Sequence, residues 1–125
     1  MQLKGKIFSG MGVGKEYLSL EPYKRKIEEI TGFRPFPGTL NLRCEKSRVE
    51  EIMNDLEASR IDSFEFEGEK YSGVNVYEAE LKDLSVAILR MDVTDYGPEV
   101  VEIVAEENLR EKFDLEDGEE ISLVF

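Results

Sequence analysis

The fold of this chain is most constrained by a succession of short strand-like segments that never alternate regularly with helices. Residues 2–9 show the pattern, because Leu3 and Ile7 alternate with Lys4 and Lys6 as expected for a half-buried strand. We expect further strands at 17–20, 40–44, 63–67, 70–72, 74–81, 85–91, 99–105 and 120–125. Without a βαβ alternation, this pattern predicts a mostly-β (α+β) barrel and not a parallel sheet.

Two or three short helices are expected among these strands. Pro22 suits the first turn of a helix that stops at Gly32. The capping-box pattern Ser47–Glu50 predicts a second helix that ends near Ser59. Glu107–Phe113 predicts a third, which a tight Asp-Gly turn separates from the last strand.

Length and charge limit the class of protein. A chain of 125 residues fits one domain, expected over residues 1–125, and Cys44, its single cysteine, rules out an internal disulfide. A net charge of −12 argues against non-specific binding to nucleic acid or to an anionic membrane. The chain has no histidine, so catalysis by Ser-His or Cys-His pairs and histidine metal sites are excluded.

The sequence also carries expectations about location. It has no run of about 18 apolar residues of the kind that crosses a membrane. Its first residues, Met1–Lys6, lack the apolar core of a signal peptide and lead directly into a strand. We therefore expect a cytoplasmic protein with no membrane partner.

Two polar side chains are expected to converge beside a glycine-rich loop. Thr39 and Asn41 are two residues apart at a strand, so they point to the same face. Two adjacent neutral oxygens suit a hard cation such as Mg²⁺ when phosphates supply the remaining charge. A second segment, here called the glycine segment, offers backbone N–H groups that could hold those phosphates. It consists of Gly10, Met11, Gly12, Val13, Gly14 and Lys15.

Each of these features also has an ordinary structural interpretation. The glycine segment is neither a Walker A loop nor a Rossmann loop, since Tyr17–Leu20 after it looks like strand, and it could be a flexible hairpin loop. Threonine is common in strands, although asparagine is disfavoured there. Glu102 could be the outward residue of an alternating strand, and Leu109 pairs with Phe113 at i, i+4 as core residues do.

Motifs spread along the whole chain carry a family resemblance. They are the glycine segment, Tyr17-Leu18-Ser19-Leu20, Pro22-Tyr23, Gly32-Phe33, Gly38-Thr39-Leu40-Asn41-Leu42, Glu99-Val100-Val101-Glu102-Ile103, Asn108-Leu109-Arg110-Glu111 and Asp117-Gly118. In their order and spacing they resemble the archaeal CTP-dependent riboflavin kinases. The resemblance implies a compact six-stranded cradle-loop β-barrel. It also implies transfer of the γ-phosphoryl of CTP to the 5′-hydroxyl of riboflavin, which gives FMN and CDP.

The same resemblance implies roles for individual residues. Thr39 and Asn41 would bind Mg²⁺ beside the nucleotide phosphates, which the glycine segment would hold. Thr94 and Glu102 would contact riboflavin, and Glu102, the candidate catalytic residue, would either accept the proton of the 5′-hydroxyl or only orient it. The cytosine pocket would be lined by Glu107, Asn108, Leu109 and Arg110. The expected partners are CTP and riboflavin, bound by a monomer.

Two other classes of function stay open from the sequence alone. The end of the chain, Leu109–Phe113 followed by Asp117-Gly118 and a strand, also resembles AbrB-like transcription regulators, but a DNA binder should be basic along one face. A flavin-binding carrier without catalysis would show the same pattern. Four aromatic residues could flank a flat flavin ring or fill the core, namely Phe33, Phe36, Tyr71 and Tyr96.

Overall fold

The computed structural model describes the backbone of residues 1–125 and every side chain except that of Val13. Its strands are β1 (Gln2–Phe8), β2 (Leu40–Cys44), β3 (Ser59–Ile61), β4 (Phe64–Phe66), β5 (Glu69–Tyr71), β6 (Val74–Leu81), β7 (Leu84–Met91), β8 (Val100–Val104) and β9 (Glu120–Val124). Its helices are α1 (Val13–Tyr17), α2 (Glu21–Thr31), α3 (Lys46–Asp55) and α4 (Leu109–Phe113). Within the described residues, none of these helices has the length and apolar character needed to cross a bilayer.

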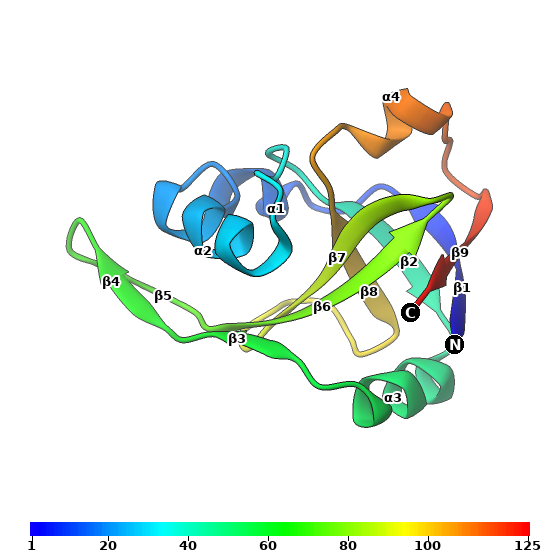
Figure 1. Cartoon of the computed structure of the whole chain (residues 1–125), viewed down its shortest axis with the longest axis horizontal. Coiled ribbons are helices and arrows are strands. Elements are labelled where there is room, and N and C mark those ends of the chain that lie inside the picture. The colour runs from blue at the N-terminus through cyan, green and yellow to red at the C-terminus, as the bar shows by residue number, and fades with distance from the viewer.

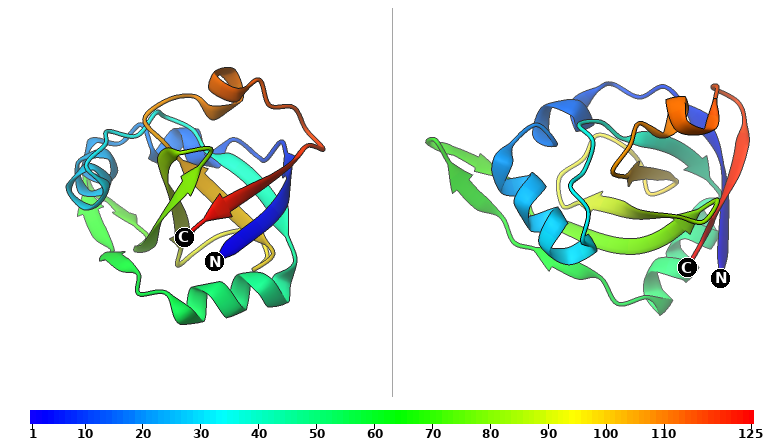
Figure 2. Two further views of the ribbon diagram at one scale, coloured as in Figure 1. Left: turned by 45° about the vertical axis from the view of Figure 1, so that its right-hand side comes forward. Right: turned by 45° about the horizontal axis from the view of Figure 1, so that its top comes forward.

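Six antiparallel strands close into a barrel, which confirms the predicted fold class. Their order is β6-β7-β8-β2-β1-β9, and the pairing of Glu80 with Val124 joins β9 back to β6. The first residues of β6 pair instead with β3, which lies outside the closed ring. The β4–β5 hairpin projects away from the barrel, while α3 and α4 lie at its opposite ends (Figures 1 and 2).

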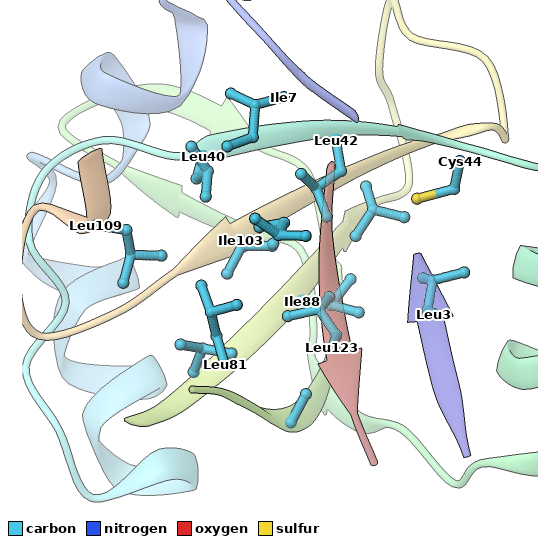
Figure 3. Packing of buried hydrophobic residues seen from close by; sticks show 14 of the residues in the cluster. Leu3, Ile7, Leu40, Leu42, Cys44, Leu81, Ile88, Ile103, Leu109 and Leu123 are labelled. Carbon is cyan, nitrogen blue, oxygen red and sulfur yellow. The ribbon is translucent and has the colours of Figure 1, made fainter. Parts of the chain in front are cut away.

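Two hydrophobic clusters hold these elements together. The larger one fills the barrel with inward-facing residues of the strands, among them Leu42, Ile88 and Ile103 (Figure 3). The second places Tyr23 and Ile27 of α2 with residues of β6, β7 and β8 that point the other way. The parts of these strands that contact α2 are therefore buried on both faces, whereas Glu78 and Glu80 in the second half of β6 are exposed. Every residue of β8 is buried.

The structure corrects two local predictions. Tyr17–Leu20 is not a strand, because α1 runs from Val13 to Tyr17 and Leu18, which has no exposed surface, donates its N–H to the carbonyl of Gly14. The glycine segment therefore does lead into a helix. Burial of Leu18 beside α2 outweighs the alternating pattern that suggested a strand.

The second correction concerns the start of α3. The helix begins at Lys46, and Glu45 occupies the N-cap position without a side-chain hydrogen bond to the backbone. The Ser47 hydroxyl, expected to cap the helix, donates instead to Oε1 of Glu45 at 2.7 Å. The helix also ends at Asp55, because the chain extends at Leu56 and then enters β3, a strand that the sequence did not predict.

Cys44 is a small residue of the barrel core. It is 8% exposed within the barrel cluster. Burial raises the pKa of the Cys44 thiol to about 11, although the positive charge of Arg90 acts in the opposite direction. A thiol with such a pKa is almost fully protonated at neutral pH, so it is a poor nucleophile.

Candidate active site

A buried pair of polar side chains lies at the centre of the candidate site. Asn41 on β2 and Glu102 on β8 are directly opposite each other in the antiparallel register, and they are 7% and 8% exposed. Among the described side chains, Asn41 and Glu102 are the only polar or charged residues that are buried. Glu102 does point away from the barrel interior, because Val101 and Ile103 on either side of it belong to the barrel cluster, but it is buried and not solvated.

Two hydroxyl groups contact this pair. Thr39 Oγ1 donates to Oδ1 of Asn41 at 3.1 Å, and the Tyr17 hydroxyl donates to Oε1 of Glu102 at 3.4 Å. The convergence of Thr39 and Asn41 on one face agrees with their two-residue spacing. Tyr17 was assigned to a strand from the sequence, so its contact with Glu102 was missed.

Burial raises the pKa of the Glu102 carboxyl above its usual value. The hydrogen bond from Tyr17, the nearby Thr39 hydroxyl and the positive charge of Arg90 act in the opposite direction. The pKa of Tyr17 is itself raised strongly, first by burial and then by the charge of Glu102. Tyr17 therefore stays protonated, and it acts as a hydrogen-bond donor to the carboxylate.

The glycine segment packs directly over the Thr39–Asn41 pair. A side chain at Gly10 would overlap Nδ2 of Asn41 and the hydroxyl of Tyr96, and a Cβ at Gly14 would lie 2.7 Å from Oγ1 of Thr39. Gly12 between them has a positive φ of 79°. Glycine is thus required here both by close approach and by backbone conformation.

The other members of the glycine segment are less closely held. Met11 is 59% exposed, and its N–H donates to the Tyr96 hydroxyl at 2.9 Å. Lys15 is exposed on α1, where its carbonyl accepts from the Ser19 hydroxyl at 2.6 Å. The side chain of Val13, predicted to contact the nucleotide, lies outside the described part of the structure.

Two cavities open on the Glu102 side of the barrel. One, of about 250 Å³, is lined by the loop between β7 and β8 together with Arg90 and Glu102. The other, of about 130 Å³, lies between that loop and the glycine segment and includes Met11, Val93 and Glu102. Thr94 and Glu102, the two predicted riboflavin contacts, line both cavities.

A third cavity, of about 140 Å³, lies on the Thr39 side. It is lined by all four residues predicted for the base pocket, namely Glu107, Asn108, Leu109 and Arg110, together with Thr39 and Phe36. Oδ1 of Asn108 caps α4 by accepting from the N–H of Glu111, and Arg110 forms an ion pair with Asp117 at 2.6 Å. Leu109 is 5% exposed and belongs to the barrel core, which confirms its interpretation as a core residue.

The structure places Arg90 and the four candidate aromatic residues relative to the cavities of the site. Arg90 lines the larger cavity and donates to the carbonyl of Val100 at 3.0 Å, and no motif singled it out. Of the four candidate aromatics, Tyr96 lines the Glu102 side and Phe36 the Thr39 side. Tyr71 instead stacks on Phe64 in the projecting hairpin. Phe33 lines a separate cavity between β6 and β9.

The donor atoms at the centre suit one kind of metal site. In the described part of the chain, no three His, Cys, Asp or Glu side chains gather in a way that could hold an ion. A metal near Asn41 would therefore depend on neutral oxygens, on a bound phosphate and on no carboxylate group other than the nearby Glu102. Thr39 Oγ1 and Asn41 Oδ1 are 3.1 Å apart. These two side-chain oxygens therefore lie close enough together to bind one ion.

Comparison with known proteins assigns the chain to a family. Residues 7–125 match the family model CTP-dep_RFKase, described as domain of unknown function DUF120, and the chain belongs to this family. A riboflavin kinase of Methanocella arvoryzae is 36% identical over 121 residues, which are 97% of this chain and 55% of that protein. A riboflavin kinase of Saccharolobus solfataricus is 34% identical over 127 residues, 98% of this chain and 73% of that protein.

The relatives are longer than this chain. It spans 55%, 57%, 59% and 52% of the length of riboflavin kinases from Methanocella arvoryzae, Methanospirillum hungatei, Pyrobaculum islandicum and Archaeoglobus fulgidus. The shared region nevertheless covers almost the whole of this chain, and it includes every residue of the site described above.

Proposed function

We propose that this chain is the catalytic domain of a cytoplasmic riboflavin kinase that uses CTP. It transfers the γ-phosphoryl group to the 5′-hydroxyl of riboflavin, giving FMN and CDP, and it works as a monomer. The observation that carries the proposal is the buried Asn41–Glu102 pair, which lies between cavities on its two sides and beneath the glycine segment. Such an arrangement would let donor and acceptor approach each other in line at one point, as phosphoryl transfer requires.

On the acceptor side, Glu102 and Thr94 hold riboflavin. The Glu102 carboxylate accepts a hydrogen bond from the 5′-hydroxyl and aims its oxygen at the phosphoryl group. Because the transition state of phosphoryl transfer is loose, positioning contributes more than a strong base does. We therefore assign Glu102 mainly to orientation, and the hydroxyl proton passes late in the reaction to an oxygen of the transferred phosphoryl group.

On the donor side, the backbone N–H groups of the glycine segment hold the phosphates and Lys15 adds a positive charge. Thr39 and Asn41 would hold Mg²⁺ through their side-chain oxygens. When bound, the ion neutralises charge on the transferring phosphate. The cavity at α4 takes the nucleotide base, with Asn108 and backbone groups as its polar contacts. The choice of cytosine is supported by the name of the family.

The test is an assay of FMN formation from riboflavin and Mg²⁺ with CTP, ATP, GTP or UTP supplied separately. We expect FMN with CTP as the best donor. FMN with a different best donor would contradict the base assignment alone. Binding of riboflavin without FMN from any nucleotide would contradict the kinase and favour a flavin carrier. Absence of both binding and turnover would contradict the whole proposal.

A further inference from the structure

We propose that Tyr17 is a positioning residue that couples the two sides of the site, so that bound nucleotide strengthens the binding of riboflavin. The inference rests on the proposed function. Nucleotide held by the glycine segment would fix α1, and α1 would fix the Glu102 carboxylate through the Tyr17 hydroxyl. The structure supports this coupling by three separate features of α1.

The first feature is the short distance along α1 between the two contacts. Gly14 and Tyr17 are three residues apart, so they lie on neighbouring positions of one helix face. Gly14 packs against Oγ1 of Thr39 on the donor side, and Tyr17 donates to Glu102 on the acceptor side. A shift of this single helical turn therefore changes both contacts together.

The second feature is the anchoring of the Tyr17 ring. It packs edge-on against Tyr23, with the ring centroids 5.6 Å apart. Tyr23 is 1% exposed, and its hydroxyl donates to the carbonyl of Ser72 at 2.7 Å. Leu18, which follows Tyr17 in the chain, is fully buried. The contact with Tyr23 therefore limits rotation of the Tyr17 ring about α1, so that the position of its hydroxyl follows the position of α1.

The third feature is the place of the Tyr17 hydroxyl in the acceptor cavity. Tyr17 lines the cavity of about 130 Å³ together with Thr94 and Glu102. Burial makes the charged form of Glu102 costly, and the hydrogen bond from Tyr17 offsets part of that cost. Loss of this bond would leave the carboxylate less firmly oriented toward a substrate hydroxyl.

The experiment measures the dissociation constant of riboflavin with and without saturating CDP and Mg²⁺. In the unaltered chain we expect CDP to tighten riboflavin binding by roughly 5-fold or more, within the usual range of coupling between sites. In Tyr17→Phe, which keeps the ring, we expect the tightening to fall below about 2-fold, while the affinity for CDP alone changes little. The same factors must appear when riboflavin is varied and CDP binding is measured, because coupling is reciprocal.

Tyr71→Phe is the matched control, because Tyr71 loses the same hydroxyl on the projecting hairpin and lines none of the three site cavities. It should keep the full coupling. If CDP does not affect riboflavin binding in the unaltered chain, or if Tyr17→Phe keeps the effect, the inference is wrong and the proposed function still stands. If the unaltered chain binds neither ligand, the proposed function itself fails.

Hydrogen exchange gives a second measurement that needs no variant. The Leu18 amide bonds to the carbonyl of Gly14 and reports on α1. We expect CDP and riboflavin, each added alone, to slow exchange of this amide. Unchanged exchange with riboflavin alone would overturn the coupling, because the acceptor would then have no effect on α1.

Discussion

The donor and acceptor sides of the Asn41–Glu102 pair are built in different ways. The donor side depends on small residues and backbone, with Gly10 and Gly14 packed against Asn41 and Thr39. The acceptor side depends on a buried carboxylate and on exposed apolar side chains, since Val93 is 77% exposed at its cavity. The donor side therefore has no room for larger side chains at Gly10 and Gly14. The acceptor side has an exposed apolar rim, where a side chain can be replaced without a steric clash. Substitutions should therefore have unequal effects on the two sides.

The largest effect is expected from Asn41→Leu, which keeps approximate volume but removes the amide oxygen that lies beside Thr39. We expect the chain to fold and the turnover number to fall on the order of 100-fold or more, because metal positioning supplies several kcal/mol in such reactions. The measurement is kcat for FMN formation, with circular dichroism as the folding control. Normal turnover in a folded variant would show that Asn41 has only a structural role.

A smaller effect is expected from Gly14→Ala, whose methyl group would lie 2.7 Å from Thr39 Oγ1. We expect CDP to bind roughly 10-fold more weakly, the equivalent of about 1.4 kcal/mol, and riboflavin without nucleotide to be weakened by a smaller factor, through the shift of α1. Gly12→Ala is the comparison. Its new methyl group would have no atom within 4 Å, but the backbone at this position must keep a positive φ. Equal loss of both ligands in Gly14→Ala would indicate general distortion of the site.

On the acceptor side, Val93→Ser removes an apolar group from the rim of the cavity. We expect riboflavin to bind about 3- to 5-fold more weakly, as burial of one or two methyl groups is worth about 1 kcal/mol. The affinity for CDP should not change. Val124→Ser, an exposed valine of β9 that lines none of the site cavities, is the matched control. A larger loss for CDP than for riboflavin would reverse the assignment of the two sides.

The smallest effect concerns stability and pH. The pKa of Glu102 in the folded chain is raised above its ordinary value of 4.5, so folding disfavours the charged form. At pH values well below 4.5 the residue is neutral in both states, and Glu102→Gln should match the unaltered chain. As the pH rises through the folded pKa, the unaltered chain should lose stability relative to the variant. Urea unfolding at a series of pH values measures this, and a difference that shrinks with rising pH would contradict it.

The sequence predicted the strands far better than their closure. Alternating residues of β1 and β6 are visible locally, whereas the pairing of Glu80 with Val124 joins residues far apart in the chain. Local patterns carry no information about such a contact, so the six-stranded closure came from family resemblance. The helix α1 was missed for a related reason, since burial of Leu18 against α2 depends on tertiary packing.

The candidate site shows the same limit. The spacing of Thr39 and Asn41 is a local signal, and the structure brings their oxygens together as that spacing predicts. The burial of Glu102 depends on the sheet on one side and on Tyr17 from α1 on the other. Arg90 acts through its position beside Glu102 in space. No spacing in the sequence reports on these two relationships.

The most direct test of the account is a crystal structure of the chain with CDP, Mg²⁺ and riboflavin bound together. The account predicts the nucleotide phosphates under the glycine segment and the base in the cavity at α4. It predicts the 5′-hydroxyl of riboflavin beside Glu102, on the opposite side of the central pair. Both ligands on one side of Asn41 and Glu102, or either ligand bound away from them, would contradict the claim that this pair is where donor and acceptor meet.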